Sequence, residues 1–182
     1  MKKLFIAVLA LVLAMPMFAQ KPYDHSIGGT VGTMYGFSYK GFITDNLAIQ
    51  ADLGVNLLTT AGSTAVKGGG SVSWQNGDFY TFEANPNLLY QNSINSWSWG
   101  GLDWFVGGGL SLGLMHGIAV TGGRPDGKFG LNGAGGVEIF WNNIPLAIST
   151  DFRPGYGLGF GTKDVTSHFF DWKLVVSVRY IL

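Results

Sequence analysis

The sequence of 182 residues contains no cysteine. Without a thiol the chain can form no disulfide, no thiolate zinc site, no cysteine nucleophile and no lipid-anchored N-terminal cysteine. Charged residues are scarce as well, at 12% of the chain, which is about half the share of an average soluble domain. The formal net charge is zero, so we expect no broad basic surface and no nucleic-acid partner.

Long apolar runs are also missing, except at the start. The first twenty residues, MKKLFIAVLALVLAMPMFAQ, have two lysines, an apolar run from Leu4 to about Met15, and then Pro16 and MFA. This order is typical of a secretory signal peptide cleaved after Ala19, and the run is too short for the alternative, a membrane anchor helix. We therefore expect a signal peptide over residues 1–19 and one domain over residues 20–182. Removal of Lys2 and Lys3 leaves 9 basic and 11 acidic residues, a net charge near −2.

After Ala19 no apolar run approaches the roughly 20 residues that a membrane-spanning helix needs. In lipid, every backbone polar group must be bonded within the protein, which only helices and closed barrels achieve. The exported chain is therefore either soluble or crosses a membrane as a β-barrel.

Instead of long apolar runs, the sequence has segments in which polar and apolar residues alternate. In the final segment, DWKLVVSVRYIL, polar residues occupy one row and apolar residues the other. A period of two indicates a β-strand rather than a helix. The pattern recurs along the chain and predicts eight strands, near 26–33, 36–43, 47–58, 79–91, 101–114, 128–141, 146–156 and 169–182.

The connections between these segments differ in length. Residues 44–46 and 142–145 are tight turns with Asn, Asp and Pro, residues 91–100 form an intermediate link, and the first two strands are joined by about two residues. The links over 59–78, 115–127 and 157–168 are long and polar. Short turns at one end and long loops at the other are typical of outer-membrane barrels. We predict an all-β fold, an eight-stranded antiparallel up-and-down transmembrane β-barrel.

The alternative is a soluble, lipocalin-like barrel with the apolar rows inside. Three features oppose it: glycines fall largely on strands, the chain ends on an alternating strand, and aromatic residues cluster at strand ends. The aromatic residues that we expect at the two membrane interfaces are Tyr35, Tyr80, Tyr90, Trp97, Trp99, Trp104, Trp141, Trp172 and Tyr180.

The last strand resembles the C-terminal assembly signal of bacterial outer-membrane barrels, with Val178, Tyr180 and Leu182 at the alternating positions and Leu182 in place of the usual Phe. The segment GFSYKGFITDNLAIQADLGV is similar to the second strand, turn and third strand of OmpX-type barrels. The segments LDWFVGGGLSLG, GGVEIFWNNIPLAISTDFRPG and VVSVRYIL resemble later strands of small outer-membrane β-barrel proteins. The resemblance implies a location in the outer membrane of a Gram-negative bacterium. It also implies three partners: membrane lipid, lipopolysaccharide and the barrel-assembly machinery.

Charged residues on the polar rows would then face the lumen. Those expected in a lumen charge network are Lys40, Asp52, Glu83, Glu138, Asp151, Arg153, Asp171, Lys173 and Arg179, with Asp103 as a further candidate. Since desolvated charges persist only when paired, they could form a salt-bridge plug or line a charged pore. Eight strands leave little room for water, which favours the plug. We expect Glu138 to pair with Arg153 on the next strand.

A catalytic site is not expected. Lipid A-modifying barrels need a His beside a Ser and a carboxylate, whereas His25, His116 and His168 are scattered. Ser167 and His168 are adjacent on a strand and so face opposite ways, and Asp171 is the nearest carboxylate. No spaced acids indicate a metal, and no motif indicates a cofactor.

Two non-enzymatic roles remain. We favour a structural barrel or one that interacts through its loops, and the alternative is a small passive channel. A lipid A-modifying enzyme is the least favoured. The neutral loops indicate no particular ligand.

Overall fold

The computed structural model describes residues 21–57, 61–66, 70–75, 79–117, 125–161 and 165–182. The expected signal peptide lies outside these residues and stays a prediction. Among the described residues, no helix is long and apolar enough to cross a membrane. The regular structure described is all β.

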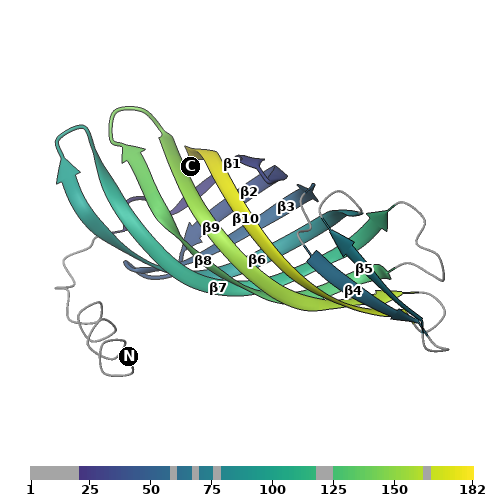
Figure 1. Cartoon of the computed structure of the whole chain (residues 1–182). Helices are drawn as coiled ribbons and strands as arrows, with labels where there is room; N and C mark the ends of the chain where they lie inside the picture. Colours follow the sequence, from purple (N-terminus) through teal and green to yellow (C-terminus); the bar gives the residue numbers. More distant parts are fainter. Residues whose placement is uncertain (1–20, 58–60, 67–69, 76–78, 118–124, 162–164) are drawn as a thin grey trace, which may run out of the picture.

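The ten strands, in chain order, are β1 (His25–Gly32), β2 (Met34–Phe42), β3 (Leu47–Asn56), β4 (Ala61–Val66), β5 (Gly70–Gln75), β6 (Phe79–Trp97), β7 (Gly100–Gly117), β8 (Pro125–Trp141), β9 (Leu146–Gly161) and β10 (Val165–Ile181). Eight of them form a ring in the order β1-β2-β3-β6-β7-β8-β9-β10, and β10 pairs back with β1 (Figure 1). Every pairing in the ring is antiparallel. The predicted eight-stranded up-and-down β-barrel is confirmed.

The two remaining strands correct the prediction of a structureless loop over 59–78. β4 and β5 pair as a hairpin, and β4 also pairs with β10 from Phe170↔Ala61 to Thr166↔Ala65. The C-terminal part of β10 pairs along the same edge with β1, from Gly32↔Val175 to Ser26↔Ile181. The hairpin therefore continues the barrel wall beyond the short β1 strand, at the end opposite the β6–β7 and β8–β9 turns (Figure 1).

The later strands are longer than predicted. β6 to β10 have 16–19 residues, whereas β1 to β3 have only 8–10. The segment 91–100, predicted as an intermediate link, is mostly strand, because β6 continues to Trp97 and β7 begins at Gly100. The part of this segment that belongs to β6, QNSINSW, has polar residues on both rows. The apolar alternation therefore ends before the hydrogen-bonded pairing of β6 with β7 ends.

The two faces of the wall differ in polarity. Along β9, residues alternate strictly between buried and exposed from Ser149 to Phe160. The exposed row holds large apolar side chains such as Phe152 and Leu158, whereas the buried row holds Asp151 and Arg153. Buried apolar side chains form only small clusters, one of which joins Tyr23, Phe42, Ala48 and Ala147. The barrel thus has a polar interior and an apolar exterior.

Glycine permits the tight curvature of the wall on its inner side. At Gly28, a Cβ atom would lie 1.9 Å from the Val178 carbonyl oxygen of the neighbouring strand. The connection between β1 and β2 depends on Gly32, whose φ of 129° is costly for any other residue. Gly32 therefore allows a link of one residue, Thr33, between these strands.

Candidate functional site in the barrel lumen

The nine residues predicted to face the lumen are all buried there, none more than 2% exposed. They come from β2, β3, β6, β8, β9 and β10, because each lies on the inward row of its strand. Their contacts, with those of Asp103 and Lys128, divide them into three groups along the barrel. We name these the turn-side, central and loop-side clusters.

Glu138 is the centre of the turn-side cluster. Its Oε2 atom accepts from Lys40 Nζ at 3.0 Å and from Arg179 NH1 at 3.2 Å. Its Oε1 atom accepts from the Tyr23 hydroxyl at 2.8 Å and from Gln91 Nε2 at 3.1 Å. Four donors thus saturate one carboxylate that is fully buried.

Further partners complete the turn-side cluster. Gln91 also donates to Asp103 Oδ2 at 2.8 Å and accepts from Lys40. Arg179 donates to the hydroxyls of Ser149, at 2.8 Å, and Ser38, at 3.1 Å. With two cations and two carboxylates the cluster is neutral.

The central cluster is built around Arg153. Its guanidinium holds Asp151 through two bonds, Nε to Oδ1 at 2.5 Å and NH2 to Oδ2 at 3.0 Å. Its NH1 atom donates to Asp52 Oδ2 at 2.5 Å, and Gln50 Nε2 donates to the same oxygen at 3.1 Å. One cation therefore faces two carboxylates.

The loop-side cluster is a square of two lysines and two carboxylates. Lys128 and Lys173 each pair with both Glu83 and Asp171; the Lys128–Asp171 distance is 2.6 Å, and Lys173 lies 3.1 Å from Glu83 and 3.0 Å from Asp171. Asn56 donates to both carboxylates. This cluster is also neutral.

Uncharged side chains fill the lumen between the central and loop-side clusters. Ser111 accepts from Lys173 at 3.4 Å and donates toward Asn85 at 2.7 Å and Asn132 at 3.2 Å. Asn132 in turn donates to Asn87 Oδ1 at 2.5 Å. A chain of uncharged hydrogen-bonded side chains therefore extends from Lys173 of the loop-side cluster into the lumen.

The expected pair of Glu138 and Arg153 is wrong. In the register of β8 and β9, Glu138 lies opposite Ser149, four residues from Arg153, or roughly 13 Å along the strand. Glu138 belongs to the turn-side cluster and Arg153 to the central one.

Sequence reasoning missed two members of the network. Lys128 shares the inward row of β8 with Asn132 and Glu138 at even spacing, so the alternation could have identified it. Tyr23 precedes β1, and no periodic pattern indicates that its ring enters the barrel.

The predicted interfacial aromatic residues all face outward, exposed or half-buried. By strand register, six lie near the short turns: Tyr90, Trp97, Trp99, Trp104, Trp141 and Tyr180. Tyr35, Tyr80 and Trp172 lie toward the opposite end. Trp97 and Trp99 stack with ring centroids 5.0 Å apart, and Trp141 lies 6.5 Å from Trp99. The residues of the resembled assembly signal, Val178, Tyr180 and Leu182, are exposed on the outer face.

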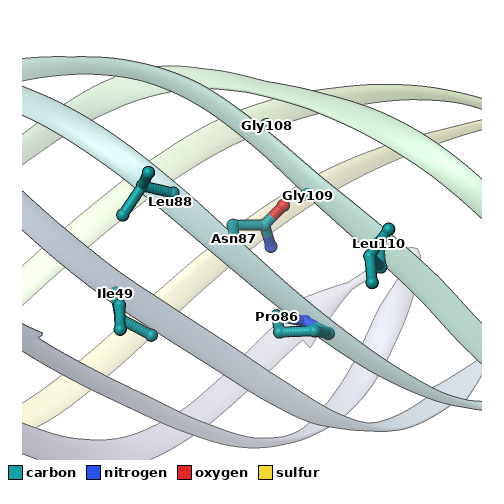
Figure 2. A pocket seen from close by; sticks show the side chains of 7 residues that line it. All are labelled: Ile49, Pro86, Asn87, Leu88, Gly108, Gly109 and Leu110. Carbon is teal, nitrogen blue, oxygen red and sulfur yellow. The ribbon is translucent and has the colours of Figure 1, made fainter.

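The outer face also has a shallow hollow between β3, β6 and β7. Figure 2 shows Ile49, Pro86, Leu88 and Leu110 around it, beside Gly108. Gly108 pairs with Leu88 and contributes no side chain, so the surface is lower there. The wall of the hollow is almost entirely apolar, which suits hydrocarbon rather than a polar ligand.

The histidines are not brought together. His25 and His168 each lie near a tyrosine hydroxyl, Tyr39 at 3.0 Å and Tyr156 at 3.1 Å, at opposite ends of the barrel. His168 faces outward, whereas Asp171 is buried in the lumen. The side chains of His116 and Ser167 lie outside the description. Across the described residues, no group of three or more His, Cys, Asp or Glu side chains is placed to hold a metal ion.

No protein-family model and no curated protein matches the chain. Among solved structures, Neisserial surface protein A (NspA) is 19% identical, with a TM-score of 0.49, over 87% of this chain and 94% of that chain. Ail, the attachment invasion locus protein of Yersinia pestis, in complex with the heparin analogue sucrose octasulfate, is 14% identical, with a TM-score of 0.32, over 86% of this chain and 97% of that chain. At these values the fold assignment rests on the strand pairing of the chain itself.

Proposed function

We propose that this chain is an outer-membrane protein of a Gram-negative bacterium whose lumen is closed by its charge network. Its role is then structural, or is exerted through its loops, and it is not an enzyme. The observation that carries this proposal is the inverted polarity of the wall, which has apolar side chains outside and, among the described residues, eleven buried charged side chains inside.

The outer face supports the membrane location. Large apolar side chains are exposed on every strand of the ring, for example Phe37 at 49%, Leu131 at 63% and Leu174 at 52%. Soluble monomers rarely expose contiguous apolar patches larger than a few hundred Å². In a bilayer the same band contacts hydrocarbon, and the aromatic residues at its two ends suit the lipid–water interfaces. Membrane lipid and lipopolysaccharide are the partners that this surface fits.

The contents of the lumen support a closed barrel. Five cations and six carboxylates are each no more than 4% exposed, and they bond to one another at three levels. Removal of one member of a buried ion pair costs about 3–5 kcal/mol, so such networks hold their side chains in place. We expect such a column of charges to leave no continuous water path, because eight strands leave little room for water.

The predicted signal peptide and the C-terminal strand account for delivery to this location. Export would remove residues 1–19, and the alternating residues Val178, Tyr180 and Leu182 would present the last strand to the barrel-assembly machinery. The backbone of Leu182 donates to the His25 carbonyl at 2.9 Å, which ties the chain end to the first strand.

Cell fractionation and gel mobility test the location. We expect the protein in the outer-membrane fraction, with faster gel migration when unheated than when boiled, because a closed barrel resists dodecyl sulfate. Recovery of folded protein from the soluble periplasm without detergent would contradict the proposal and favour a soluble barrel.

A small passive channel is the alternative, and the polar side chains that line much of the lumen between Gln91 and Asn56 are the observation in its favour. Planar-bilayer recordings of the refolded protein decide between the two. We expect conductance at background level. Steady single-channel currents through the wild-type protein would contradict the closed lumen and favour the channel.

A further inference from the structure

The central cluster differs from its two neighbours in charge. The turn-side and loop-side clusters each balance two cations with two carboxylates, whereas the central cluster sets Arg153 against Asp52 and Asp151. Both aspartates are no more than 2% exposed. With both aspartates ionised, the described side chains of the central cluster have a formal charge of −1, and a buried charge persists only with a partner.

The acceptors of this cluster that lack a donor can be located to single atoms. Arg153 engages both oxygens of Asp151, and Asp52 Oδ2 accepts from Arg153 and from Gln50. The other oxygen of Asp52, Oδ1, is buried and has no hydrogen-bond partner among the described residues, and the same is true of Gln50 Oε1. Two acceptors, one of them anionic, are thus left without donors on side chains that already bond to each other.

The side chains of β2 beside this pair make their hydrogen bonds with other residues. Ser38 lies opposite Asp52 and accepts from Arg179, and Lys40 lies opposite Gln50 and bonds to Glu138 and Gln91.

The side chains of β6 beside this pair also make their hydrogen bonds with other residues. Asn85 lies opposite Asp52, and its amide donates to Glu83. Asn87 lies opposite Gln50, and its amide donates to the Asn85 carbonyl. Neither strand flanking the pair supplies a donor to the two open oxygens.

We propose that Asp52 Oδ1 and Gln50 Oε1 bind one monovalent alkali cation in the centre of the barrel. A carboxylate and an amide oxygen are hard ligands of the type that alkali and alkaline-earth ions prefer. A single positive charge neutralises the cluster, whereas a divalent ion would reverse the imbalance. The site concerns the lumen alone, so it stands whether or not the barrel is a closed outer-membrane protein.

The experiment measures unfolding of the refolded barrel in detergent micelles at constant ionic strength, with sodium, potassium or N-methyl-D-glucamine as the cation. Binding only to the folded state raises the folded-to-unfolded ratio by 1 + [L]/Kd, about elevenfold at ten times the dissociation constant. We expect a saturable gain with sodium or potassium. The bulky organic cation should give none.

Two variants make the test specific. Asp52→Asn removes the excess charge, and we expect it to abolish the dependence on alkali ions. Asp103→Asn is the matched control, because Asp103 also accepts from a glutamine amide, at 2.8 Å, but belongs to the neutral turn-side cluster. This control should keep the dependence.

A direct probe covers the case in which Asp52→Asn fails to fold. Wild-type crystals soaked in thallium(I), a potassium mimic, should show an anomalous peak between Asp52 Oδ1 and Gln50 Oε1. Equal stability in all cations together with no thallium peak would overturn the site. An infrared band of a protonated carboxyl that disappears in Asp52→Asn would overturn it too, and would assign the balancing charge to a proton.

Discussion

The two faces of β10 differ in polarity and in exposure. On the outer face Leu174, Val176 and Val178 are 38–52% exposed, whereas on the inner face Lys173, Ser177 and Arg179 are completely buried. Adjacent residues of one strand thus meet opposite environments. A soluble sheet would place these rows the other way round, so the comparison supports the proposal that the outer wall contacts lipid.

The two faces are also stabilised by different means. An outer side chain needs only an apolar surrounding, so one apolar residue can replace another. An inner charge needs its own partners, because a buried charge left without one costs several kcal/mol. We therefore expect substitutions inside to depend on their partners and those outside to depend on polarity alone.

The largest effect is expected for Glu138→Gln, which removes a carboxylate bonded by Lys40, Arg179, Tyr23 and Gln91. It should lower the free energy of unfolding by about 3–5 kcal/mol, because two cations lose their shared partner. Denaturant unfolding in lipid vesicles measures the loss.

Double mutants show whether this loss depends on the partner. Lys40→Gln with Glu138→Gln should recover part of the loss, with a coupling energy of about 0.5–3 kcal/mol. Arg153→Gln with Glu138→Gln should be additive within about 0.5 kcal/mol, since the two residues belong to different clusters. Equal coupling in both pairs would refute the division into clusters.

The outer face is tested by Val176→Arg. Val176 is 38% exposed near the middle of β10, and a charge there should cost about 2–4 kcal/mol in a bilayer. Val176→Leu is the control and should change little. A Val176→Arg protein as stable as the wild type would mean that this face does not contact lipid.

Neighbouring glycines on β1 compare the two faces by shape alone. At Gly28 an added Cβ would meet the Val178 carbonyl oxygen at 1.9 Å, whereas at Gly29 the nearest atom, the Gly36 carbonyl oxygen, is 3.6 Å away. Gly28→Ala should cost about 1–3 kcal/mol through overpacking, and Gly29→Ala should be close to neutral. The same unfolding assay measures both, and a reversed order would mean that β1 is turned over.

The smallest effect is expected outside the barrel wall, where exposed Lys21 and Asp24 form an ion pair. Asp24 raises the pKa of Lys21, and Lys21 lowers the pKa of Asp24. Any stabilisation is present between the ordinary pKa values of the two groups. It is lost as pH falls through the lowered pKa of Asp24 or rises through the raised pKa of Lys21. Water screens such pairs, so Lys21→Ala should leave the unfolding midpoint unchanged at pH 7, and a clear shift would contradict this.

Alternation predicted the fold and the facing of the wall because apolar side chains occupy one row of each strand and mostly polar side chains the other. It predicted the strand end poorly beyond Tyr90, where both rows of the chain are mostly polar. It missed the two strands in the segment 59–78, where each strand has only six residues.

Alternation also identified most of the lumen charges but not their partners. The partners depend on the register between neighbouring strands, which places Glu138 opposite Ser149 rather than Arg153. No local sequence pattern determines this register. Alternation also could not identify Tyr23, because its ring enters the barrel from a segment that has no alternating pattern. The uneven charge of the central cluster follows only from the contacts.

The central claim, that the apolar row faces lipid and the charged row fills the lumen, is tested most directly by spin labels along β10. The absence of native cysteine allows single cysteines at positions 174 to 179, labelled one at a time in reconstituted vesicles. We predict oxygen-collision maxima at 174, 176 and 178, with low accessibility to both oxygen and a water-soluble nickel reagent at 175, 177 and 179. A water-accessible label at 176 with a lipid-exposed label at 177 would contradict the account.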